Sequence, residues 1–294
     1  MEASDILKKI RKIEISTKAL VNEVFSGEYH SMFKGHGLEF AEVREYQEGD
    51  SYKEIDWMVT ARMGKPHIKK FNETRELNVL FIVDVSASSQ FGTQHQLKSE
   101  IIAELTGLLS FSALSNNDKV GLILFSDKIE QYSPPRKGRK NTLKILRDIL
   151  YFNSVGKQTK IEKAIEFVWK IAKKKSIVFI ISDFFDTGYE HSLKILSKKH
   201  DVVAFRIIDP TEIELPDAGI IHMQDPETGK TITINSSSNQ FRDSFQKYIS
   251  QQNNEIEKRF KRMKIDFLTI KTNEEYIKNL IKFFKNRVKR LKRG

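Results

Sequence analysis

Short apolar runs alternate with longer amphipathic segments from about residue 78 to the end of the chain. Four of these runs are rich in valine, isoleucine and phenylalanine, at residues 78–83, 120–125, 177–182 and 202–208. Continuous apolar runs of this length are typical of strands that are buried on both faces. Their alternation with helical segments predicts an α/β domain, Rossmann-like, with a mainly parallel sheet flanked by helices.

Three segments between the runs carry apolar residues at intervals of three or four, at residues 94–114, 143–151 and 161–171. This spacing predicts amphipathic helices that cover the sheet. A turn at residues 126–128 precedes a short strand at 129–132, which we expect to be antiparallel at a sheet edge. The predicted order of elements is βαββααβαβ.

The alternation is interrupted after Asp209-Pro210 by a polar stretch that contains a predicted hairpin. The elements expected from here on are strands at 219–223 and 231–234 with a turn at 226–229, a long helix at 239–263, a last strand at 265–270 and a final helix from residue 273. We therefore expect one α/β domain over residues 76–294, with a hairpin insertion near 211–238.

Residues upstream of 76 show a different pattern. Residues 1–30 predict an N-terminal helix, whereas residues 31–75 contain several glycines and no sustained helical stripe. We interpret residues 31–75 as a small β-rich N-terminal module.

Composition narrows the class of protein. The 294 residues are 39% hydrophobic and include no cysteine, which excludes a disulfide scaffold, a thiolate metal site and a cysteine nucleophile. The N-terminal residues lack the continuous apolar stretch of a signal peptide, and no apolar run approaches the ~20 residues that span a bilayer. We therefore expect a globular, cytoplasmic protein without a transmembrane segment.

Lysine and arginine exceed the acidic residues by 50 to 39, so the formal net charge is +11. Seven of the basic side chains lie in residues 282–293, KFFKNRVKRLKR, without an acid among them. Such a cluster can bind nucleic acid or an anionic membrane, but it also complements the dipole of its own C-terminal helix. We favour the second interpretation and keep the first as an alternative.

Oxygen ligands follow two of the predicted buried strands. Asp84, Ser86 and Ser88 come directly after the first strand, and Asp183 follows a later one. Ligands of an open α/β sheet bind beyond the carboxyl ends of its strands, so we expect these side chains at one crevice. Thr159, just before a predicted helix, adds another hydroxyl. Hard oxygen donors suit Mg²⁺ or Mn²⁺ rather than Zn²⁺, although such residues can also simply cap helices.

In order and setting, these five residues resemble the metal-ion-dependent adhesion site (MIDAS) of von Willebrand factor A domains. The resemblance implies that three hydroxyls hold the ion directly and two carboxylates hold it through water, namely Ser86, Ser88 and Thr159, and Asp84 and Asp183. It also implies that an acidic residue of a partner protein completes the metal shell. Phe184 stands where many A domains have glycine, and we expect it to narrow access to the ion.

Further motifs resemble the bacterial family called domain of unknown function 58. They are GHGLEF at 35–40, REYQEGD at 44–50, IDW at 55–57, TAR at 60–62, DPTE at 209–212, LP at 215–216 and DPETG at 225–229. Members are A-domain proteins commonly encoded beside MoxR-type AAA+ ATPases and other A-domain proteins, and are thought to mature or assemble protein complexes with them. The resemblance implies such partners here. Many members carry N-terminal transmembrane helices, and we expect this chain to be a form without them.

Two interpretations of the upstream motif remain open. Its charged and aromatic residues are Glu39, Arg44, Asp50, Asp56, Trp57 and Arg62. They can form a buried ion-pair and aromatic network that holds the small module against the α/β domain. They can instead form a surface that docks a partner, with Arg44 and Arg62 as charge-assisted contacts.

The leading hypothesis for function is a non-enzymatic module that binds Mg²⁺ or Mn²⁺ and, through the ion, an acidic residue of a partner protein. The sequence contains no Gly-x-Ser-x-Gly elbow, no His-Glu-x-x-His motif and no Gly-x-x-x-x-Gly-Lys-Ser/Thr phosphate loop. We therefore assign no catalytic residue. A metal-dependent phosphoester or nucleic-acid hydrolase remains the alternative enzyme.

Overall fold

The structure is a computed structural model that describes residues 3–21, 39–72, 76–90, 97–154, 156, 158–224 and 231–291. The chain divides into two compact units. The first combines Met1–Phe33 with Leu77–Gly294, and the second is Lys34–Glu76.

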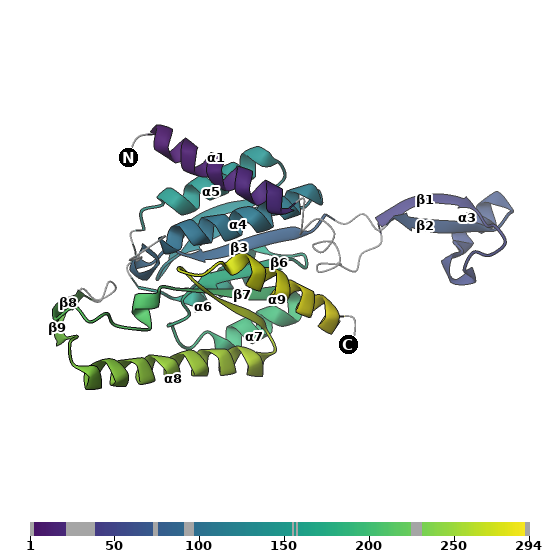
Figure 1. Cartoon of the computed structure of the whole chain (residues 1–294). Helices are drawn as coiled ribbons and strands as arrows, with labels where there is room; N and C mark the ends of the chain where they lie inside the picture. Colours follow the sequence, from purple (N-terminus) through teal and green to yellow (C-terminus); the bar gives the residue numbers. More distant parts are fainter. Residues whose placement is uncertain are drawn as a thin grey trace. The chain divides into compact units, whose positions relative to one another are not determined.

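A six-stranded sheet forms the centre of the first unit (Figure 1). Its strands lie in the order β10-β7-β6-β3-β4-β5. Its strands are β3 (Asn78–Asp84), β4 (Lys119–Phe125), β5 (Ile129–Arg136), β6 (Ile177–Ser182), β7 (Asp201–Ile208) and β10 (Asp266–Lys271). All neighbouring strands are parallel except β4 and β5, which are antiparallel. The predicted fold class, α/β with a mainly parallel sheet, is confirmed.

Helices cover both faces of this sheet. One face carries α1 (Ala3–Leu20), α4 (Lys98–Ser115), α5 (Arg139–Tyr151) and α9 (Tyr276–Leu291). The other face carries α6 (Ile161–Ile171), α7 (Glu190–Lys199) and α8 (Asn239–Met263). The first unit therefore has three layers, with a hydrophobic core on each side of the sheet.

Strand β3 shows why the central strands are apolar throughout. Val79, Phe81 and Val83 pack into one core, and Leu80 and Ile82 pack into the other. All five are buried, and burial of a side chain of this size contributes about 1.5–3 kcal/mol. A polar residue at any of these positions would lose that contribution, so the strand shows no polar alternation.

Strand β5 is longer than the predicted strand at 129–132. It continues through Pro134 and Pro135 to Arg136, which pairs with Val120 of β4. Proline has no N–H to donate to a ladder, so it is rare inside a sheet. It is tolerated here because β5 is an edge strand and its pairing with β4 shifts in register.

The segment after β7 forms the predicted hairpin, in which β8 (Ile220–Gln224) pairs with β9 (Thr231–Asn235). The turn expected at 226–229 lies outside the described residues. The predicted long helix is α8, which Ser238 caps by accepting a hydrogen bond from Phe241 N. None of the helices in the described part of the chain is long and apolar enough to cross a bilayer.

The second unit is built on an antiparallel hairpin of β1 (Glu39–Glu45) and β2 (His67–Asn72). A short helix, α3 (Trp57–Met63), lies between these strands in the chain and was not predicted. Its seven residues are too few to display a helical stripe in the sequence. The Asp56 side chain caps α3 by accepting from two backbone N–H groups, and Gly64 ends it in the left-handed region.

Candidate functional site

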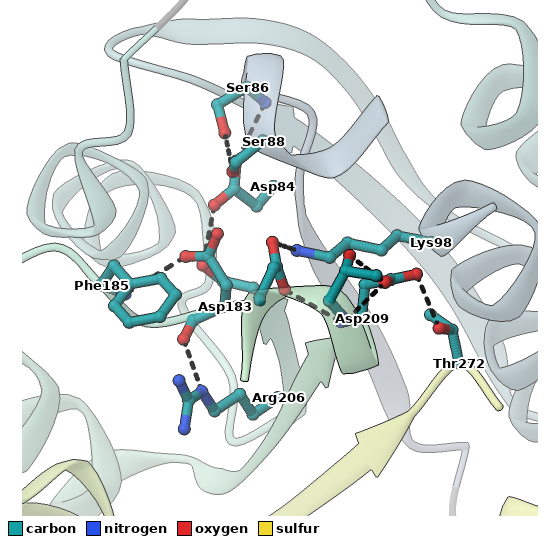
Figure 2. Close-up of polar contacts among 12 residues, drawn as sticks. Asp84, Ser86, Ser88, Lys98, Asp183, Phe185, Arg206, Asp209 and Thr272 are labelled. Carbon is teal, nitrogen blue, oxygen red and sulfur yellow. Dashed lines mark hydrogen bonds and ion pairs between the residues drawn. The ribbon is translucent and has the colours of Figure 1, made fainter. Parts of the chain in front are cut away.

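The carboxyl ends of β3 and β6 bring two of the predicted ligands together. These strands are parallel neighbours with Val83 opposite Ile181. The residues that follow them therefore lie at the same end of the sheet, where the parallel strands have their carboxyl ends. Asp84 ends β3, and Asp183 comes directly after β6. Figure 2 shows the two carboxylates close to each other.

Three hydroxyl groups form a chain of hydrogen bonds beside Asp84. Thr159, which precedes α6, donates from Oγ1 to Ser86 Oγ over 2.9 Å. The hydroxyls of Ser86 and Ser88 lie 3.1 Å apart. The predicted hydroxyl ligands therefore meet at one point, although they come from segments 73 residues apart.

Asp84 is held by its own turn and by the neighbouring strand. Its Oδ1 accepts from Ser86 N at 2.9 Å, and its Oδ2 accepts from the Ser182 hydroxyl at 2.7 Å. Burial, and then the charge of Asp183, raise the pKa of Asp84 to about 7 despite these hydrogen bonds. Ser182 ended a predicted strand, but nothing in the sequence marked it as a site residue.

A small cavity of about 10 Å³ borders both carboxylates. Its lining residues are Asp84, Ser88, Lys98, Ile102, Ser182, Asp183 and Ile207. A volume of this size is close to the lower limit for one water molecule. The site can therefore hold a single small ion or water, and it is too small for an organic ligand.

The donor set fits a hard divalent cation. Every donor is a carboxylate or hydroxyl oxygen, which suits Mg²⁺ or Mn²⁺. The charge of Asp183 disfavours the charged form of Asp84, and a cation between the two carboxylates would relieve that repulsion. Within the described residues, no group of three or more His, Cys, Asp or Glu side chains offers a different kind of metal site.

An ion pair of a buried lysine and a partly buried glutamate beside the cavity was not predicted. Lys98 is 2% exposed and donates to Glu212 Oε1 over 2.5 Å (Figure 2). Burial raises the pKa of Glu212, and the charge of Lys98 opposes that shift. In the sequence, Lys98 could not be distinguished from a surface lysine, because its partner lies 114 residues away.

Arg206 positions the backbone of Asp183. It is buried in β7, and its Nε donates to the Asp183 carbonyl oxygen at 2.8 Å. Its guanidinium lies 5.0 Å from the centre of the Phe185 ring. Arg206 was also not predicted as a site residue. Its place inside an apolar strand could have indicated one, since a buried charge is rare unless it has partners.

Phe184 does not narrow access to the site, so that expectation is wrong. Its ring is fully buried and packs against Phe260 and Tyr189, with ring centroids 4.9 and 6.0 Å away. The backbone adopts φ 58°, in the left-handed region that glycine occupies without strain. The side chain lies in the core beneath α7 and α8.

An ion pair orders the predicted motif of the second unit. Arg44 makes a bidentate pair with Asp50, in which both N–O distances are 2.8 Å. Asp50 Oδ2 also accepts from Gln47 N at 2.8 Å. Charge-assisted bidentate bonds of this kind hold geometry firmly, so the pair fixes the turn after β1.

The other described residues of the motif differ in their surroundings. Asp56 caps α3, while Trp57 is 70% exposed and Arg62 is exposed as well. The side chain of Glu39 lies outside the described ones. Both interpretations, the buried network and the docking surface, therefore stay predictions.

Several known proteins are similar to this chain. Uncharacterized protein Rv1480 of Mycobacterium tuberculosis (strain ATCC 25618 / H37Rv) is 26% identical over 281 residues, which cover 95% of this chain and 88% of the relative. Among solved structures, conserved hypothetical protein BatB from Bacteroides thetaiotaomicron is 17% identical with a TM-score of 0.46, over 72% of this chain and 99% of that chain. The SpRpn10 VWA domain is 8% identical with a TM-score of 0.40, over 70% of this chain and 94% of that chain.

The family assignment rests on the sequence. Residues 42–255 match the family described as "Protein of unknown function DUF58". This match includes the motifs at 44–62 and 209–229 and all five oxygen ligands of the candidate site. The chain therefore belongs to the DUF58 family.

Proposed function

We propose that this protein binds Mg²⁺ or Mn²⁺ at the cluster of Asp84, Ser86, Ser88, Thr159 and Asp183, and through the ion holds an acidic residue of a partner protein. The observation that carries the proposal is the pair of buried carboxylates, Asp84 and Asp183, set against each other beside a hydrogen-bonded row of hydroxyls. Buried like charges are costly unless a counter-ion compensates them.

The chain's own contacts support a division of roles within the cluster. Both oxygens of Asp84 already accept hydrogen bonds, from Ser86 N and from Ser182, so Asp84 is suited to act through water. The hydroxyls of Ser86, Ser88 and Thr159 are then the direct ligands, as the resemblance to a MIDAS implies. The ion supplies a strong positive field at which a carboxylate of another chain can bind.

We infer a binding function rather than an enzymatic one. Metal-dependent hydrolysis usually needs a second ion about 4 Å away or a positioned general base. The cavity is lined by two carboxylates, both hydrogen-bonded, and by Lys98, whose ammonium group is engaged by Glu212. This arrangement supports the retention of a ligand more than the activation of water.

The partner that family membership favours is a MoxR-type AAA+ ATPase, together with other A-domain proteins. In that role the protein is an adaptor in the assembly or maturation of a protein complex in the cytoplasm. Recognition of an acidic side chain through the ion leaves the rest of the surface to provide specificity.

The proposal is tested by calorimetric titration of Mg²⁺ into the wild type and two variants. Asp84→Asn keeps the shape of the side chain and removes its charge, and it is expected to weaken Mg²⁺ binding at least about tenfold. Asp118→Asn is the matched control. Asp118 is an equally buried aspartate that accepts from Leu77 N at the amino ends of β3 and β4, away from the candidate site. Its Mg²⁺ affinity is expected to stay unchanged.

Partner binding is measured with a purified MoxR-type ATPase from the same organism, with Mg²⁺ and with EDTA. Retention that needs both the ion and Asp84 supports the adaptor role. Equal retention by Asp84→Asn, or retention in EDTA, contradicts it. Absence of Mg²⁺ binding by the wild type contradicts the metal site itself.

A further inference from the structure

Strand β10 forms an open edge of the six-stranded sheet, with β7 on its other side. Just after the strand, Thr272 N donates to Ile208 O at 3.0 Å, so the backbone groups of Thr272 point toward β7. Because this direction alternates along a strand, the N–H and C=O groups of Phe267 and Thr269 point away from β7. Within the described part of the chain, no backbone hydrogen bond reaches these outward groups.

A groove of about 1210 Å³ lies beside this edge and is lined by residues of α8, β10 and α9. Its apolar lining includes Phe260, Phe267 and Phe283, and Thr269 also contributes to it. The Thr269 hydroxyl is buried and has no hydrogen-bond partner among the described residues. An apolar surface next to unpaired backbone groups is a template for one more strand.

Basic side chains surround the groove. Its charged lining residues are Lys258, Lys261, Lys264, Arg287 and Arg290, against Glu257 and Asp266. Asp266 is already neutralised by ion pairs with Arg287 and Arg290. The three lysines are exposed to solvent, and Lys258 forms an ion pair with Glu255 over 2.9 Å. The field that an incoming chain meets is therefore positive, and an acidic segment complements it.

We propose that this groove binds an extended, acidic segment of a partner protein, which pairs with β10 as an additional strand of the sheet. Main-chain hydrogen bonds to Phe267 and Thr269 hold the segment, while its alternate side chains contact Phe267, Phe283 and the exposed lysines. The proposal does not depend on the metal site, because neither the edge nor the groove includes a residue of that cluster.

Two other occupants are less favourable. A second copy of this chain that paired edge to edge would bring two basic rims together, and like charges at an interface oppose association. Nucleic acid would match the charge, but it has no regular series of N–H and C=O groups to pair with a strand edge. Both remain distinguishable outcomes of the test.

The probe is a fluorescein-labelled peptide of alternating aspartate and valine, titrated with the full-length protein in EDTA and followed by fluorescence anisotropy. We expect saturable binding that weakens as the salt concentration rises. Lys258→Glu/Lys261→Glu is expected to weaken it at least about tenfold. The matched control, Lys247→Glu/Lys278→Glu, changes the same charge on α8 and α9 outside the groove lining, and its affinity should stay within about twofold of the wild type.

A second pair of variants tests the backbone contact. Thr269→Pro removes the outward N–H, and proline is tolerated where an edge N–H faces away from the sheet. Thr269→Val keeps that N–H and removes only the hydroxyl. We expect Thr269→Pro to bind the peptide at least about tenfold more weakly, because it loses a main-chain hydrogen bond and disturbs the bonds that form next to it. Thr269→Val is expected to bind like the wild type.

Amide hydrogen exchange of the wild type provides a readout that needs no variant. The peptide is expected to slow exchange at Phe267 and Thr269, and to leave the amides of Leu268 and Ile270, which face β7, unchanged. Absence of saturable binding, or full binding by Thr269→Pro, overturns the proposal. A loss of peptide affinity seen only with the lysine variants also overturns it and indicates a nucleic-acid or membrane surface. Self-association that Thr269→Pro abolishes, without any binding of the peptide, overturns it as well.

Discussion

Ser182 donates a hydrogen bond of 2.7 Å from its hydroxyl to Asp84 Oδ2. The same oxygen of Ser182 accepts from Phe184 N at 3.1 Å. One side chain at the end of β6 thus fixes both the carboxylate at the end of β3 and the turn that carries Asp183. The relative position of the two carboxylates depends on this residue.

Ser182→Ala is expected to weaken Mg²⁺ binding about 10–100-fold, the usual effect of removing a group that orients a metal ligand. The measurement is the calorimetric titration used for Asp84→Asn. Ser112→Ala is a suitable control, because Ser112 is also buried but donates to Leu108 O within α4. An unchanged affinity in a well-folded Ser182→Ala protein would show that Ser182 does not position Asp84.

Lys98→Met is expected to destabilise the protein by about 1–3 kcal/mol, because it leaves the partly buried carboxylate of Glu212 without its counter-charge. Urea denaturation measures the free energy of unfolding. Lys98→Met/Glu212→Gln removes both charges and keeps an acceptor for Asp209 N, which now bonds to Glu212 Oε2. The double variant should recover most of the loss; if it is as unstable as Lys98→Met, the ion pair is not the cause.

Substitutions of Phe184 separate backbone strain from packing. Phe184→Ala removes a fully buried ring and is expected to cost about 3–5 kcal/mol. Phe184→Gly loses the same ring but accepts the positive φ without strain, so it should be more stable than the alanine variant by about 1 kcal/mol. Urea denaturation of the two variants side by side checks this. An alanine variant as stable as the glycine variant would contradict the strain at this position.

His200 is expected to make the protein sensitive to mild acid. Burial, and then the charge of Lys199, lower the pKa of His200 to about 4 from its ordinary value of 6.5. The unfolded chain takes up this proton below pH 6.5 and the folded one does not. The stabilising contribution is therefore complete above the ordinary pKa and is lost as the pH falls toward about 4, by at most about 1.4 kcal/mol per pH unit.

The free energy of unfolding is measured at several pH values between neutral pH and about pH 4, the lowered pKa of His200. His200→Asn keeps an acceptor for Ser176 N, which now donates to His200 Nδ1 at 3.2 Å, and cannot titrate. Its stability should fall less steeply with acid than that of the wild type. His191 is exposed, so His191→Asn should follow the wild type. Parallel curves for all three proteins would contradict the prediction.

Elements with a regular repeat could be predicted closely from the sequence. The predicted helices at 161–171 and 239–263 coincide with α6 and α8, and the predicted strand at 177–182 coincides with β6. Periodicity and strand composition are local properties, so they survive without knowledge of the tertiary fold. Helix α3 was not predicted because its seven residues are fewer than the roughly 11 over which a helical stripe can be recognised.

The order of the oxygen ligands could also be predicted, because the carboxyl ends of parallel strands share one edge of a sheet. The groups that support them could not. Lys98 bonds to Glu212 and Thr159 bonds to Ser86, although the partners are 114 and 73 residues apart in the chain. No local feature of the sequence indicates such a pair.

By itself, the sequence determined the α/β class, the mainly parallel sheet and the oxygen chemistry of the candidate metal site, since these follow from residue type and short-range spacing. The tertiary structure alone decided that Ser182 orients Asp84, that the ring of Phe184 enters the core and that β10 has an open edge beside a basic groove. The physical reason is that contact, burial and strand order depend on which distant segments meet, and packing of the whole chain determines that.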